Sequence, residues 1–197
     1  MKRNIFLMGA AAAILTGCVV TSVCPYYTEK DLVTEPAIPG YWTNRKNPNE
    51  TWKFEQTTDL AYRLTLAEPS KTTVMETHAF KLQGQLFLDI FSLEQDYHVI
   101  PAHYLLKVDQ TSPTLRFSEL DDAWLKSFLT NKPTAIACHM LDNPDNPAAS
   151  RVVLTADTSA LQSLVMRHLK TPGAWKDAFE LRREVSTIKT AQVKGSL

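Results

Sequence analysis

The sequence predicts an α+β fold, a curved antiparallel β-sheet or partly closed barrel with three helices packed on one side. Between residues 40 and 117, segments of alternating apolar and polar residues follow one another, as β-strands do. Patterns with a helical period begin only after these segments. The turns between the strands are short, and strands joined by short turns usually pair as antiparallel neighbours. Helices that follow such a sheet would cover one of its sides.

About six strands precede the first helix. Residues 60–66 alternate most regularly, since Tyr62 and the leucines around it share one face. Residues 85–91 are apolar on both faces, which predicts a strand covered on both sides. Gln83-Gly84 is a signal for a tight hairpin before that strand.

The segments with a helical period are residues 118–131, 157–170 and 174–184, and two short strands at 134–141 and 151–156 separate the first two. Ser118 and Asp121 give the first helix an acidic form of the capping box. Trp124 is expected to anchor that helix on the sheet. Either Asp157 or Thr158 caps the second helix.

The start of the chain has the composition of a targeting segment. Two basic residues follow the initial Met, and an apolar run then extends to Leu15-Thr16-Gly17-Cys18. This run is shorter than the roughly 20 apolar residues that a membrane-spanning helix needs. The pattern therefore indicates a signal peptide, and the small residues before the cysteine indicate where it is cleaved.

Leu15-Thr16-Gly17-Cys18 resembles the lipobox of bacterial lipoproteins. The resemblance implies cleavage before Cys18, a diacylglycerol on its sulfur and a further acyl chain, such as palmitate, on the new N-terminus. An ordinary secretory signal and a buried apolar N-terminus are the alternatives. Cys24 fits less well because no Leu lies three residues before it. Since the residue after Cys18 is not Asp, the resemblance implies a lipid anchor in the bacterial cell envelope, at the outer membrane.

The expected organisation is a lipoprotein signal peptide at 1–17, a tether at 18–39, a single globular domain at 40–183 and a frayed tail at 184–197. Acidic and basic residues are balanced over the chain, which argues against a nucleic-acid-binding surface. The expected partner is the membrane, which the lipobox resemblance implies is reached through the acyl chains on Cys18. If Cys18 is lipidated, Cys24 and Cys138 remain for one possible disulfide or stay as two unpaired thiols.

No local motif indicates catalysis or a metal site. The histidines at 78, 98, 103, 139 and 168 lack metal-ligand spacing, and there is no GxSxG, phosphate-loop or dinucleotide motif. The acidic pair Asp121-Asp122 suits the first turn of a helix, and Asp142 and Asp145 suit a polar hairpin loop. We therefore expect no catalytic residue, no metal and no cofactor.

Gly40-Tyr41-Trp42 resembles the Gly-x-Trp start of lipocalins. The resemblance implies a barrel that carries an apolar small molecule, although the predicted helix at 118–131 interrupts the eight-strand run of that family. The candidate cavity residues are Trp42, Trp52, Phe54 and Tyr62, and an ordinary core, which needs no function, is the other interpretation of the same residues.

Two functions remain open. The first is a non-enzymatic envelope lipoprotein that binds an unknown protein partner or supports assembly. The alternative is a lipocalin-like carrier of an apolar ligand. The domain also resembles those of other bacterial lipoproteins, which implies no particular activity. A cavity inside the sheet would favour the carrier, and a filled interior would favour the binding module.

Overall fold

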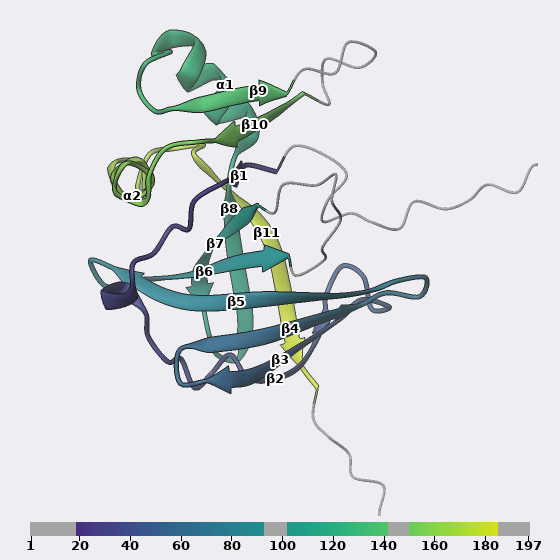
Figure 1. Ribbon diagram of the computed structural model, residues 1–197. Helices are drawn as coiled ribbons and strands as arrows, with labels where there is room; N and C mark the ends of the chain where they lie inside the picture. The colour runs from purple at the N-terminus through teal and green to yellow at the C-terminus, as the bar shows by residue number, and fades with distance from the viewer. Residues whose placement is uncertain (1–18, 93–101, 142–149, 185–197) are drawn as a thin grey trace, which may run out of the picture.

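The computed structural model describes residues 19–92, 102–141 and 150–184 (Figure 1). The barrel strands are β2 (Gly40–Asn44), β3 (Thr51–Thr58), β4 (Ala61–Ala67), β5 (Thr72–Leu82), β6 (Gln85–Ser92), β7 (His103–Gln110), β8 (Thr114–Leu120) and β11 (Trp175–Arg183). The remaining elements are β1 (Thr21–Ser22), the 3-10 helix η1 (Glu29–Asp31), α1 (Asp122–Asn131), β9 (Cys138–Leu141), β10 (Arg151–Leu154) and α2 (Thr158–Arg167).

Eight strands form a closed antiparallel barrel, in the lower part of Figure 1. Strands β2 to β8 each pair with the next, and β11 joins β8 to β2 and closes the ring. The Gln83-Gly84 turn between β5 and β6 has positive φ angles of 48° and 86°, as a tight hairpin requires. The predicted antiparallel strands and barrel are therefore confirmed, and the barrel is fully closed.

The prediction of three helices was wrong, because the described residues contain two α-helices. The third predicted helix, residues 174–184, is instead the barrel strand β11. Its register shifts between Asp177 and Phe179, where a bulge breaks the two-residue alternation. The sequence of this strand was mistaken for a helix because its alternation is irregular and because it contains good helix formers such as Ala, Lys, Glu and Arg. The segment forms a strand because its backbone pairs with β8 on one side and with β2 on the other.

The first helix begins later than predicted. Residues 118–120 belong to β8, and Asp121 is the N-cap, where its carboxylate accepts a hydrogen bond from the Trp124 amide at 2.7 Å. In the second helix the N-cap is Asp157, whose carboxylate accepts from the Ala160 amide at 2.8 Å. The predicted start of the first helix, at Ser118 with Asp121 inside the helix, was therefore wrong by three residues, whereas Asp157 is one of the two predicted candidates for the second cap.

A second layer lies above the barrel in Figure 1 and contains β1, β9, β10, α1 and α2. Strand β1 pairs antiparallel with β7 of the barrel and parallel with β10, and β10 pairs antiparallel with β9. The short strand β1 therefore connects the barrel wall to the outer hairpin.

Two hydrophobic clusters result. The first fills the barrel, and the second lies between the barrel wall and the helices. Strand β6 serves both, because Leu88 and Ile90 point into the barrel while Phe87 belongs to the outer cluster. The prediction that this strand is covered on both faces is confirmed.

The segment predicted as a tether lies against the domain from residue 19 onward. Val20 is 4% exposed, Tyr26 1% and Ile38 0%. Tyr26 belongs to the outer cluster, and Ile38 belongs to the barrel interior. The N-terminal segment, residues 19–39, is thus part of the folded unit.

Candidate functional site

The predicted cavity residues all lie inside the barrel. Trp42, Trp52, Phe54 and Tyr62 are each 1% exposed and share one cluster. The ring centroids of Trp52 and Phe54 are 6.1 Å apart, and those of Trp52 and Phe179 are 5.1 Å apart. The structure therefore brings these aromatic side chains together as the sequence predicted, in contact with one another.

The polar atoms of these aromatic residues have partners in the protein. Trp52 Nε1 donates to Glu50 Oε1 at 2.6 Å, and this 3% exposed carboxylate also accepts from Asn44 Nδ2 at 2.9 Å. Trp42 Nε1 donates to the Ile38 carbonyl at 2.9 Å. These hydrogen bonds hold the indoles in place without a ligand.

The barrel interior is filled by its own side chains. Sixteen side chains of the interior cluster are 0 to 8% exposed, and five partly buried ones, including Met75, Tyr104 and Phe179, pack against them. A void wide enough for water would expose surface on the side chains that line it, and those sixteen show almost none. Barrels of eight strands can be filled by side chains or hold one small ligand, so the strand number alone does not decide between the two.

A polar cluster that the sequence analysis missed lies on the outside of the barrel, below the N-terminal segment. Asp89 of β6 is 0% exposed, and its Oδ1 lies 2.6 Å from His103 Nδ1 on β7. Its Oδ2 accepts a hydrogen bond from the backbone amide of Tyr26 at 2.9 Å. A single carboxylate in the apolar strand QLFLDIF was the available signal, because a strand covered on both faces must bury it.

A second histidine lies beside this carboxylate. His78 on β5 is the cross-strand neighbour of Asp89, and its Nδ1 is 3.0 Å from the Tyr27 hydroxyl. On its other side, His78 Nε2 is 3.7 Å from Glu76 Oε1. Burial lowers the pKa of His78, and the nearby carboxylates of Glu76 and Asp89 only partly oppose this effect.

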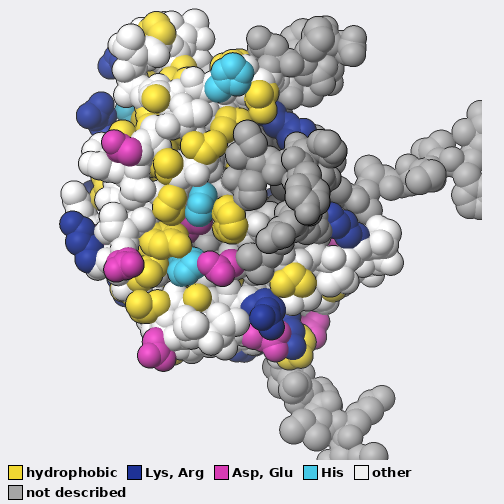
Figure 2. Space-filling model, in the orientation of Figure 1, with side chains coloured by type: hydrophobic (Ala, Val, Ile, Leu, Met, Phe, Trp, Pro, Cys, Tyr) yellow, Lys and Arg dark blue, Asp and Glu magenta, His cyan; other side chains and the backbone are white. Residues whose placement is uncertain are grey.

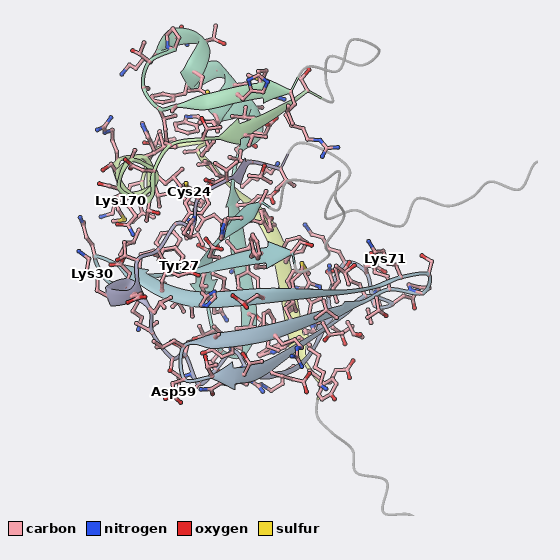
Figure 3. All side chains as sticks on the ribbon, in the orientation of Figure 1. Cys24, Tyr27, Lys30, Asp59, Lys71 and Lys170 are labelled. Atoms are coloured by element: carbon pink, nitrogen blue, oxygen red, sulfur yellow. The ribbon has the colours of Figure 1, made fainter. Side chains whose placement is uncertain are left out.

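The same environment acts on the two tyrosines. Burial, followed by the charge of Asp89, raises the pKa of Tyr27 to about 12 and raises the pKa of Tyr26 further. Both tyrosines stay neutral at physiological pH. Figure 3 labels Tyr27 in front of the barrel, where the N-terminal segment crosses it.

The cluster has part of the geometry of a catalytic triad, since a buried carboxylate orients an imidazole. Within the described residues, however, no Ser, Thr or Cys side chain forms a hydrogen bond to His78 or His103. The second oxygen of Asp89 is occupied by the Tyr26 amide. The arrangement is suited to fastening the N-terminal segment to the barrel wall.

The cysteines are placed as follows. Cys24 and Cys138 are free thiols, both half-buried, at the margin of the outer cluster. Figure 3 labels Cys24 on the N-terminal segment. Cys18, the predicted lipid site, lies outside the described residues.

The other residues that the sequence analysis considered as candidate site residues lie in separate parts of the structure. His139 is exposed on β9, and His168 packs its ring against Trp124 and Phe128, where burial lowers its pKa. Asp122 is buried and pairs with Lys126 at 2.7 Å. His98, Asp142 and Asp145 lie outside the described residues. In the described part of the chain, no group of three or more His, Cys, Asp and Glu side chains could hold a metal ion.

An open groove of about 530 Å³ lies between α2 and the β5–β6 hairpin. Its lining includes Lys81, Gln83, Ser159, Ser163 and Arg167. This mostly polar lining does not suit the apolar ligand of the carrier hypothesis.

No protein-family model, no curated protein and no solved structure matches this chain. Among the described residues, no helix is both long enough and apolar enough to cross a membrane.

Proposed function

We propose that this protein is a lipid-anchored lipoprotein of the bacterial cell envelope, and that its domain acts as a non-enzymatic binding or assembly module. The proposed anchor is Cys18, from the resemblance of Leu15-Thr16-Gly17-Cys18 to a lipobox. Because Val19 follows Cys18, the same resemblance favours the outer membrane. The partner is a protein contacted through the outer surface of the domain.

The observation that carries the surface function is the filled barrel. A carrier must hold its ligand in an enclosed apolar space, but the aromatic residues that would line this space are already buried against one another. Opening a pocket would separate these contacts and leave a cavity whenever the ligand is absent. A domain with a filled interior must recognise partners from outside.

The anchor is tested by metabolic labelling with an acyl-chain analogue. The full chain should take up the label and remain in the membrane fraction. Cys18→Ala should abolish both labelling and membrane retention, while Cys24→Ala should change neither. Labelling that is lost only with Cys24→Ala would refute the assignment of the anchor.

The carrier alternative is favoured by the closed barrel and its aromatic interior. It is tested by titrating fatty acids into a variant with Trp124→Phe and Trp175→Phe, so that the fluorescence comes from Trp42 and Trp52 inside the barrel. We expect no saturable change. A saturable change would favour the carrier over the binding module.

The partner itself is sought by native mass spectrometry of the protein purified from its own membrane. The surface function predicts a stoichiometric protein complex. A protein that carries only a stoichiometric apolar small molecule would contradict it.

A further inference from the structure

The register of three strands places the start of β1 on the same side as the start of β10 and the end of β9. Thr21 of β1 pairs with Val153 of β10 in parallel, and Val153 pairs with His139 of β9. Arg151, the first residue of β10, lies two residues before Val153 and pairs with Leu141. Neighbouring strands are about 4.8 Å apart, so this end of β9 lies roughly 10 Å from the line of β1.

No linker separates Cys18 from the folded domain, because the next residue, Val19, already pairs with it. Val19 forms a β-bridge with Asp121, and Val20 is 4% exposed within the outer cluster. An acyl chain on Cys18 would therefore hold this side of the domain directly against the bilayer. This step rests on the proposed lipid anchor.

Apolar side chains are exposed at this end of the hairpin. Met140 is 37% exposed and Leu141 49%, although both belong to a strand. Their strand β9 is the last of the sheet order, so one edge of it is unpaired in the described structure. In Figure 1 the end of β9 and the start of β10 point to the same side as the start of β1.

A cation accompanies these apolar side chains. Arg151 lies opposite Leu141, is exposed, and has no ion-pair partner among the described residues. Figure 2 shows hydrophobic and basic side chains near one another in the upper right part of this face. Apolar side chains that enter the acyl boundary beside an arginine at phosphate depth are typical of a peripheral membrane contact.

We propose that the described end of the β9–β10 hairpin, where Leu141 and Arg151 share one face and Met140 lies on the other, rests on the phospholipid bilayer that holds the acylated Cys18. The contact fixes the orientation of the domain on the membrane. The barrel end that carries Asp59, labelled at the opposite corner of Figure 3, then faces away from the lipid.

The test measures contact, because acyl chains alone would keep every variant in the membrane. A photo-crosslinking amino acid replaces Leu141 in the full acylated chain, which is reconstituted in vesicles of phosphatidylethanolamine and phosphatidylglycerol. Leu60, 40% exposed at the β3–β4 turn beside Asp59, is the matched control. After irradiation we expect phospholipid adducts at position 141 and none at position 60.

A second arm examines the charge. Arg151→Glu should reduce adduct formation at position 141 in vesicles with phosphatidylglycerol, whereas Arg182→Glu, an exposed site on β11, should not. Equal adduct yields at positions 141 and 60 would overturn the proposal, as would the absence of phospholipid adducts at position 141.

The two possible failures are distinguishable. Mass spectrometry of the same sample reports whether Cys18 is acylated. Acylated protein without lipid adducts at position 141 refutes the membrane contact and leaves the anchor intact. Protein without acyl chains refutes the proposed anchor and, with it, the orientation that depends on it.

Discussion

The guanidinium carbon of Arg183 lies over the ring of Trp42, 4.3 Å from its centroid. Arg183 Nη1 donates to the Pro39 carbonyl at 3.0 Å and Nη2 donates to the Ala37 carbonyl at 2.7 Å. The last residue of β11 thus holds strand β2 and the segment that leads into it. The barrel is closed at this end by a side chain as well as by the backbone pairing of β11 with β2.

Arg183→Met should lower the free energy of unfolding by about 1 to 3 kcal/mol. The substitution keeps an apolar stem over Trp42 but removes the cation and two charged hydrogen bonds to carbonyls. Chemical denaturation monitored by tryptophan fluorescence measures the loss. Arg182→Met is the matched control, because the side chain of this neighbour makes no hydrogen bond, ion pair or ring contact among the described residues, and a change of similar size in both would contradict the assigned role.

Gly40→Ala should destabilise the protein for two separable reasons. Gly40 has φ +133°, which an L side chain rarely adopts, and an added Cβ would lie 2.6 Å from Arg183 Nη1. We expect a loss of about 1 to 3 kcal/mol from the backbone strain. In the Arg183→Met background the steric part disappears and the backbone part remains. A Gly40→Ala variant as stable as the parent chain would show that the backbone at the start of β2 relaxes at no cost.

Asp89→Ala should release the N-terminal segment from the barrel. It leaves the Tyr26 amide and His103 Nδ1 without their acceptor in a buried place, which costs about 3 kcal/mol. Limited proteolysis between Tyr26 and Ile38 should become faster, and the denaturation midpoint should fall. Asp59→Ala, at an exposed turn, should change stability by less than about 0.5 kcal/mol. Unchanged proteolysis in Asp89→Ala would show that this carboxylate does not fasten the segment.

Stability should fall as the pH drops from 7 to 5. Burial lowers the pKa of His78 below its ordinary value of 6.5, and His168 behaves in the same way. In this range the unfolded chain binds protons that the folded protein binds less readily, so protonation favours unfolding. The groups facing His78 are Glu76, Asp89, His103 and the Tyr27 hydroxyl.

His78→Gln measures the contribution of His78 to this pH dependence. The variant keeps a hydrogen-bonding group beside Tyr27 but no longer titrates. The decrease in the free energy of unfolding between pH 7 and 5 should therefore be smaller than in the parent chain. A decrease of equal size in both would mean that His78 takes no part in the acid response.

Leu125, rather than Trp124, should be the main anchor of α1. Leu125 is 0% exposed, whereas Trp124 is half-buried and stacks on Phe128 with the ring centroids 5.3 Å apart. Leu125→Ala should cost about 2 to 5 kcal/mol. Trp124→Ala should cost less, because part of its surface already meets water. Denaturant melts of both variants measure which substitution lowers the free energy of unfolding more. A larger decrease for Trp124→Ala would support the expectation from the sequence that Trp124 is the main anchor.

The candidate site was only partly predictable from the sequence. The aromatic residues Trp42, Trp52, Phe54 and Tyr62 were assigned correctly to one interior, because two-residue alternation fixes which side chains share a face. Whether that interior is hollow or filled depends on how side chains from eight strands meet, which alternation does not specify. The Asp89 cluster was missed because its members come from three strands and the N-terminal segment, far apart along the chain.

Several local features of this protein were readable from the order of its residues: the strand periods of β2 to β8, the Gln83-Gly84 turn, Asp157 as a candidate cap of the second helix and the cysteine that resembles a lipid site. These features depend on neighbours within a few residues. Long-range contacts, in contrast, decided that residues 175–183 form a strand, because β8 pairs with their backbone groups on one side and β2 on the other. They also decided that residues 19–39 lie on the barrel, because a buried carboxylate 63 residues away accepts a hydrogen bond from the Tyr26 amide. In both places the long-range pairing of polar groups outweighs the local preference of the residues.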